Sequence, residues 1–136
     1  MKISRTVSYA LQATLLLAEA GSDRPVPCSR LSEIGQMPER FLLQILRNLV
    51  THDILDSTRG VDGGYRLRRS PNEISVLDVI EAIDGPVNPK MPEGAGLSEG
   101  SRKRMANTLE KLAETSRKQL RSVKLSDLLD GKPGTR

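Results

Sequence analysis

Residues 57–69, STRGVDGGYRLRR, bring together three glycines, one aspartate and four arginines. Glycine and aspartate tolerate the positive φ angles of tight turns, so the pattern predicts a hairpin with strands at 54–58 and 65–69 joined by RGVDGG. A glycine-rich turn of this kind either cradles the phosphate of a nucleotide or carries arginines to a nucleic acid. The Gly-Lys-Ser/Thr of a nucleotide-binding loop is missing, which favours the second chemistry.

The arginines of this hairpin have different positions in it. Arg59 stands at the base of the turn, where a guanidinium suits the negative potential of a narrow minor groove. Alternation along the second strand puts Arg66 and Arg68 on the face opposite Tyr65 and Leu67, and for these two a nucleic-acid contact and the ordinary charge of an edge strand stay equally open. The glycines would let the backbone approach a phosphate without a clashing Cβ.

A second set of polar side chains lies on residues 38–52, PERFLLQILRNLVTH, which predict a strongly two-faced helix opened by Pro38. Arginine and glutamine read base edges in the major groove through paired hydrogen bonds, which makes the polar face a candidate for DNA recognition. That face holds Arg40, Gln44, Arg47 and Thr51, with Asn48 at its edge. The apolar face holds Phe41, Leu42, Ile45, Leu46, Leu49 and Val50.

These two elements need a body to position them. Helical spacing predicts a helix over 3–20 and a short one over 28–36, with Leu31 and Ile34 on one face. A further helix, 75–84, opens with a Ser75–Asp78 capping box and a staple between Ile74 and Val79. Helix, short helix, two-faced helix and glycine-tipped hairpin, in that order, predict a mainly α winged helix-turn-helix domain over 1–84 with one small β-hairpin.

The rest of the chain predicts an appendage to that domain. Residues 85–97 form a Pro/Gly linker, and residues 98–121 resume a helical pattern about 36 Å long. Its thin apolar stripe cannot easily be buried on its own domain, so a long dimerisation helix that pairs with a second copy is expected. A short terminal helix over 124–131 completes the 98–130 segment, and 132–136 form a frayed tail.

Composition sets the class of protein. The net charge of +4 and the pI of about 9.5 favour a polyanionic partner, with an acidic stretch, 71–97, between two basic segments. No apolar run has the length of a membrane span, and the first residues lack a signal-peptide pattern, so a cytoplasmic location without membrane contact is expected. A single histidine, His52, and a single cysteine, Cys28, give no support for a nucleophile–base pair or a metal site, so no enzyme is predicted.

Cys28 has two interpretations. A position near a helix start favours a thiolate, which would suit a redox switch. A small buried hydrophobic side chain is the favoured alternative.

The chain resembles the Rrf2 family of bacterial winged-helix transcription regulators in four segments. They are MKISRTVSYAL, PVPCSRLSEIGQMPERFLLQIL, RGVDGGYRL (where the family usually has RGPGGGYxL) and ISVLDVIEAIDGP. The resemblance covers residues 1–86 well and 98–130 loosely. It implies a homodimer on a pseudo-palindromic operator, with double-stranded DNA contacted by Pro38, Arg40, Phe41, Gln44 and Arg59. With Arg47 and Arg66 from the residue pattern, these form the predicted DNA-binding set. A repressor is the role we predict for this chain.

Three departures from the family pattern are visible. Leu43 occupies a place where the family often has glutamate, so the operator preference is expected to differ. The opening SRTVSY loses part of a basic backbone contact, for which Arg5 is the nearest substitute. Many members hold an iron–sulfur cluster on three cysteines between the last two main helices, but residues 85–112 contain no cysteine or histidine, and Glu93 and Glu99 alone could not hold a cluster. No cofactor is therefore expected.

Two other functions stay open at this point. The same face could dock an acidic protein, which would make the chain a winged-helix protein-interaction module. Alternatively, a DNA-binding regulator could take its signal from a partner protein or a small ligand near the linker.

Overall fold

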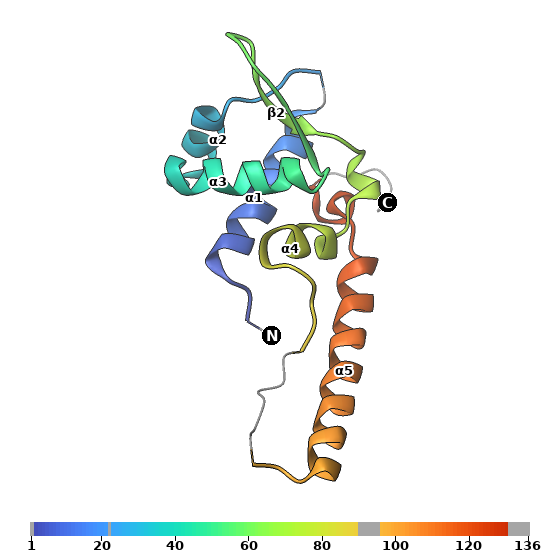
Figure 1. Ribbon diagram of the computed structural model, residues 1–136. Coiled ribbons are helices and arrows are strands. Elements are labelled where there is room, and N and C mark those ends of the chain that lie inside the picture. The colour runs from blue at the N-terminus through green and yellow to red at the C-terminus, as the bar shows by residue number, and fades with distance from the viewer. Residues whose placement is uncertain (1, 22, 90–95, 131–136) are drawn as a thin grey trace.

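The computed structural model describes residues 2–21, 23–89 and 96–130 (Figure 1). Three helices come first: α1 (Arg5–Ala20), α2 (Cys28–Gly35) and α3 (Glu39–Thr51). They are followed by β1 (Leu55–Thr58), β2 (Gly64–Leu67), a short 3-10 helix η1 (Pro71–Glu73) and α4 (Val76–Asp84). The long α5 (Glu99–Ser122) and a 3-10 turn η2 (Leu125–Leu128) end the described chain. The predicted fold class, mainly α with one hairpin in a winged helix-turn-helix, is confirmed.

The core lies where α1, α3 and α4 meet. Small residues on α1, Ala10 and Ala13, let the other two helices approach it closely, and both are fully buried. The one buried hydroxyl of α1, on Thr14, donates to the carbonyl of Leu11, so it is satisfied inside its own helix. From α3 the core takes Leu42, Ile45, Leu46 and Leu49, which confirms the predicted orientation of that helix.

The turn between α2 and α3 fixes the angle of the recognition helix. Gln36 adopts the left-handed conformation at φ 53°, and Met37 then turns into the core. Ser32 on α2 donates to the Met37 carbonyl, and Pro38 caps α3 at its N-terminus. One expectation was wrong here, because Phe41 is exposed although the apolar pattern placed it on the side of the helix that docks on the body. Ile34, predicted to share a face with Leu31, is exposed as well, whereas Leu31 is buried. Phe41 lines a groove with Arg5, Thr6 and Tyr9 of α1, but these residues do not cover it.

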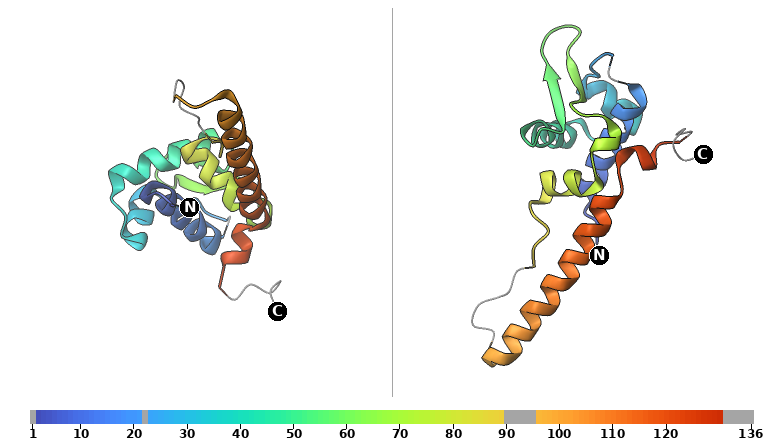
Figure 2. Two further views of the ribbon diagram at one scale, coloured as in Figure 1. Left: turned by 90° about the horizontal axis from the view of Figure 1, so that it is seen from below. Right: turned by 90° about the vertical axis from the view of Figure 1, so that its right-hand side faces the viewer.

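The hairpin is a two-stranded sheet that an isolated bridge joins to the body. β1 and β2 pair antiparallel from Leu55↔Leu67 to Thr58↔Gly64. Val26, in the connection between α1 and α2, forms two backbone hydrogen bonds of 2.8 Å with Tyr65 on the outer edge of β2. The wing is therefore attached to the body at Tyr65, and its tip projects (Figure 2).

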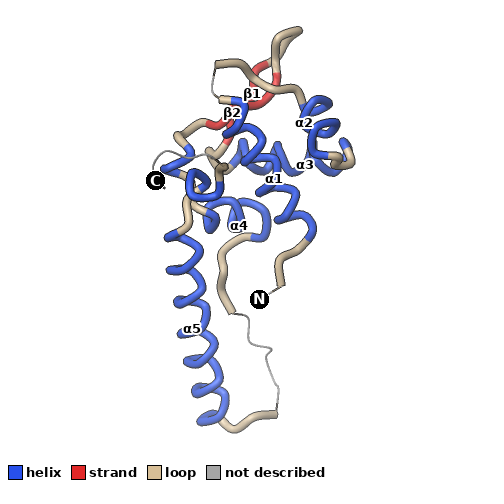
Figure 3. The backbone as a smooth tube through the Cα atoms, turned by 180° about the vertical axis from the view of Figure 1, so that it is seen from behind, coloured by secondary structure: helices blue, strands red, loops and turns tan. Residues whose placement is uncertain are grey.

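The C-terminal helix stands away from this body. The end of α5 that begins at Glu99 lies far from α1–α4, at the opposite end of the molecule from β1 and β2 (Figure 3). After α5 the chain returns to the core, where Leu125 is fully buried and the Ile74 carbonyl accepts from its backbone N–H. The predicted capping box of α4 is present, with Ser75 and Asp78 exchanging hydrogen bonds.

Hydrogen bonds among Glu81, Val87 and Arg117, called the clasp below, join the start of the predicted linker to both neighbouring helices. The Val87 N–H donates to the Glu81 carboxylate on α4 at 3.1 Å, and the Val87 carbonyl accepts from Arg117 on α5. Arg117 also pairs with Glu110 at 2.8 Å. The middle of the linker, 90–95, and the predicted tail lie outside the described residues. Among the residues that are described, no helix has both the length and the apolar character of a membrane crossing.

Candidate nucleic-acid interface

The outward face of α3 carries the polar side chains that the sequence placed there. Arg40, Gln44, Arg47 and Thr51 are all exposed, and Asn48 is half-buried at the edge. Within the described chain neither Arg40 nor Arg47 has a carboxylate in ion-pair range, so both guanidinium groups keep their donors for a partner. Gln44 donates weakly to the Asn48 side-chain carbonyl, at 3.4 Å.

The four hairpin arginines divide into two pairs. Arg68 is bound to Asp53 at 2.5 Å and lies 3.8 Å from Asp56, which ties the base of the wing to the end of α3. Arg69 donates to the Glu73 carbonyl. Arg59 and Arg66 are exposed and, in the described part of the chain, form no ion pair. The side chains of Arg59 and Arg66 are thus available to bind a partner, whereas those of Arg68 and Arg69 stabilise the fold through contacts within the protein.

A groove of about 710 Å³ runs between the second half of α3 and the wing. It brings Arg47 and Thr51 from the helix opposite Ser57, Thr58 and Arg59 from the hairpin. Guanidinium and hydroxyl groups are common donors to the phosphate oxygens of DNA. The two hydroxyls on β1, Ser57 and Thr58, were missed by sequence reasoning; their signal was the pair of polar residues directly before Arg59.

A second groove, of about 320 Å³, lies on the other side of α3 against the first turns of α1. Phe41, Gln44 and Asn48 line it from α3, with Ile45 as its apolar wall. From α1 come Arg5, Thr6 and Tyr9, so Arg5 does lie beside the recognition helix, as expected for a substitute backbone contact.

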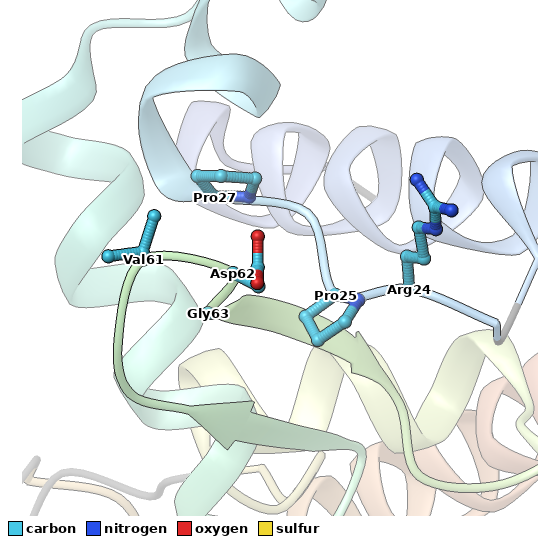
Figure 4. A pocket seen from close by; sticks show the side chains of 6 residues that line it. All are labelled: Arg24, Pro25, Pro27, Val61, Asp62 and Gly63. Atoms are coloured by element: carbon cyan, nitrogen blue, oxygen red, sulfur yellow. The ribbon is translucent and has the colours of Figure 1, made fainter.

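A third recess, of about 520 Å³, lies under the tip of the wing (Figure 4). Asp62 points into it, towards the connection that holds Pro25 and Pro27, and Arg24 lies at the far side. Val61 is fully exposed at the tip. The substitution of Val-Asp for the family's usual Pro-Gly therefore places one apolar and one acidic side chain on the wing, and the acidic one is turned towards the body.

The wing glycines are required chiefly by contacts inside the protein. A Cβ on Gly63 would lie 2.2 Å from the Thr58 carbonyl oxygen, and a Cβ on Gly64 would lie 2.4 Å from the Val26 backbone. Only Gly60, at φ 107°, has open space around it. Close approach to a phosphate therefore stays a prediction for Gly60 alone among the wing glycines, whereas Gly63 and Gly64 allow the hairpin to close and to dock.

Cys28 begins α2 at the floor of the groove between α3 and the wing. Burial raises the pKa of its thiol, and the Glu39 carboxylate raises it further. Its Sγ lies 3.9 Å from the Glu39 carbonyl, a geometry in which the protonated thiol is the donor. These contacts favour the thiol form over the thiolate that a redox switch needs.

We expect Cys28 to react with iodoacetamide several-fold more slowly than a free cysteine at pH 8. A raised pKa means a smaller thiolate fraction at every pH below it. The difference in rate between Cys28 and free cysteine should therefore vanish as the pH rises past the pKa of the Cys28 thiol in the folded protein. Glu39→Gln removes the Glu39 charge, the smaller of the two causes that raise the pKa of Cys28, and should therefore raise the alkylation rate of Cys28 at pH 8. The alkylation rate between pH 7 and 10 measures this, and a reaction faster than that of free cysteine would contradict it.

Comparisons with known proteins agree with this geometry. The structure superposes on that of CymR, the global cysteine regulator of Bacillus subtilis, with a TM-score of 0.75, 25% identity and coverage of 94% of this chain and 95% of that one. T. potens IscR gives the same TM-score at 26% identity, over 100% of this chain and 91% of that one. The fold of these regulators is the fold of this chain.

Proteins that are similar in sequence are described as helix-turn-helix transcriptional regulators. IscR of Pectobacterium carotovorum is 30% identical over 133 residues, which cover 97% of this chain and 81% of that protein. An HTH-type transcriptional regulator of Mycobacterium tuberculosis is 41% identical over 87 residues, covering 64% of this chain and 54% of that protein. The matched region thus spans about half the length of the first curated relatives.

The family model that matches residues 3–131 is that of Rrf2, described as an iron-dependent transcriptional regulator. The residues of this chain do not fit an iron–sulfur cluster, because such clusters are held by several thiolates and the sequence has one cysteine and one histidine. In the described ranges, moreover, no three His, Cys, Asp or Glu side chains come together as metal ligands. With its fold and its helix-turn-helix relatives, the chain belongs to the Rrf2 family of transcriptional regulators, which are not enzymes.

Proposed function

We propose that this protein binds DNA sequence-specifically as a homodimeric repressor in the cytoplasm, without a cluster or other cofactor. The observation that carries the proposal is a set of exposed guanidinium groups that form no ion pair within the described chain. Arg47 on α3 and Arg59 on the wing line one groove, and Arg40 lies on the same outward face of α3. Arginine and glutamine at the start of a recognition helix read guanine and adenine, and a wing arginine suits the adjacent minor groove. Pro38, Phe41, Gln44 and Arg66 complete the proposed contact set.

The proposed dimer pairs two copies of α5. None of the 24 residues of this helix is buried by its own chain, and Leu112 is 60% exposed. A helix with an uncovered apolar stripe is stabilised by pairing with another. A two-fold dimer presents two recognition helices, which explains why a pseudo-palindromic operator is expected.

The test is a titration of the purified protein with a duplex from its own promoter region at several salt concentrations. Counterion release should weaken the complex steeply as salt rises. Arg40→Ala should cost about 1–3 kcal/mol at one base position and relax the preference there, whereas Arg59→Ala should weaken binding to all duplexes and lower the salt slope by about 1.

Arg104→Ala is the matched control, because Arg104 is an exposed arginine near the far end of α5. It should leave both the affinity and the salt slope unchanged. An acidic protein docked on the same face would show a similar salt dependence, so a scrambled duplex of equal length is included. Equal binding to both duplexes, or no effect of Arg40→Ala and Arg59→Ala, would contradict the proposal.

A further inference from the structure

We propose that Phe41 reads the 5-methyl group of a thymine in each operator half-site. The inference rests on the DNA-binding function proposed above and names the chemistry of one contact in it. Phe41 is the only phenylalanine of the chain, and it is 66% exposed on a helix whose other large apolar side chains are mostly buried or half-buried. A phenyl ring that stays exposed lacks about 2 kcal/mol of the free energy gained on burial, and a partner that covers the ring would supply it.

The position of Phe41 is that of a base-reading residue. It lies in the first turn of α3, three residues after the Pro38 cap, and the N-terminal residues of a recognition helix approach the base edges. Gln44 follows one turn later on the same groove. Arg5 and Thr6 lie across that groove, where a strand seated against Phe41 would bring a phosphate.

The chemistry of the ring selects the base. A phenyl ring has no hydrogen-bond donor or acceptor, so it gains nothing from the polar edges of guanine, cytosine or adenine. Thymine is the one base of ordinary DNA that presents an apolar group, its C5-methyl, in the major groove. Ile45, which lines the same groove, provides an apolar wall behind that methyl.

Gln44 fits the neighbouring position. Its weak hydrogen bond to Asn48 uses one N–H and leaves the side-chain carbonyl and the second N–H available. Those two groups are the pair that recognises adenine through N6 and N7. Phe41 and Gln44 together therefore specify an A·T-containing step, whereas Arg40 suits a neighbouring guanine.

The experiment replaces each thymine of a bound promoter duplex, one at a time, with deoxyuridine, which removes only the methyl. One position in each half-site should lose affinity about three- to fivefold, the equivalent of one methyl group buried. Phe41→Ala should weaken binding to the natural duplex and make it insensitive to uracil at that position. Phe41→Leu should keep most of the sensitivity, and Arg59→Ala should keep all of it while weakening every duplex. Because Phe41 is exposed, these variants should retain the stability of the parent protein.

Two results would overturn the inference while leaving the proposed function standing. One is a duplex that binds with an Arg40-dependent preference but tolerates uracil at every position. The other is a uracil effect that persists unchanged in Phe41→Ala. A protein that binds no promoter duplex at any salt concentration would overturn both the proposed function and this inference.

Discussion

Alanine at position 64 is expected to lower the free energy of unfolding by about 3–5 kcal/mol, a large share of a small domain's stability. Gly64 has φ 149°, where an L side chain is strained, and a Cβ there would meet the Val26 carbonyl group at 2.4–2.5 Å and the Pro27 nitrogen at 2.7 Å. These neighbours are backbone atoms that cannot rotate away, so the contact between β2 and the 24–27 connection must open. Urea denaturation followed by circular dichroism measures the loss.

Two other glycines make the comparison specific. Gly60 also has a positive φ, 107°, but open space around it, so Gly60→Ala should show the backbone strain alone, about 1–2 kcal/mol. Gly100 lies in the first turn of α5 with nothing near it, and alanine there should be neutral or slightly stabilising. Equal losses for Gly60→Ala and Gly64→Ala would show that the contact with Val26 does not matter.

The hairpin shows which features of the structure a local sequence pattern can predict. Its existence follows from turn chemistry, and the predicted strands at 54–58 and 65–69 are within a residue or two of those observed. The use of its glycines and arginines could not be predicted, because both depend on segments distant in sequence. Gly64 meets Val26, 38 positions earlier, and Arg68 meets Asp53, which lies in the turn after α3.

The recognition helix was predictable for a different reason. Its apolar residues recur with the period of a helix, so one side had to face the core, and Arg40, Gln44 and Arg47 had to face outward. Periodicity could not give the width of the buried side. That width is set by which segments pack over α3, and they leave Phe41 uncovered. Phe41 is 66% exposed and lines an open groove against the first turns of α1, and it is the residue on which the thymine proposal depends.

In the C-terminal region, too, some features could be predicted from local sequence and others could not. The capping box of α4 is a local pattern and it is present. Ile74 and Val79, the predicted staple, are both fully buried. The return of the chain after α5, which buries Leu125 in the same core as residues of α1 and α3, is a contact between distant segments that no local pattern indicates. This return, with the clasp of Val87 between Glu81 and Arg117, fixes the base of α5 against α4. A dimer formed through the outer part of α5 would therefore set the separation of the two recognition helices.

Glutamate at position 112 is expected to convert the protein to a monomer and to weaken binding to its promoter duplex at least about 100-fold, the lower range of what two linked half-sites contribute. Leu112 is 60% exposed in the protomer, so the substitution leaves the protomer core intact, and glutamate is a good helix former. In a dimer through α5 the two-fold axis would bury two unpaired carboxylates, at a cost of several kcal/mol. Sedimentation equilibrium gives the dimer dissociation constant, and the titration described above gives the affinity.

Asn107→Glu is the matched control for this substitution. It makes the same change of charge on an exposed position of α5, more than 100° around the helix from Leu112, and should preserve both the dimer and the affinity. A Leu112→Glu protein that stays dimeric would show that α5 does not form the interface. One that is monomeric but binds the duplex with undiminished affinity would show that a single winged helix is enough, because the loss of one linked half-site must otherwise appear in the measured affinity.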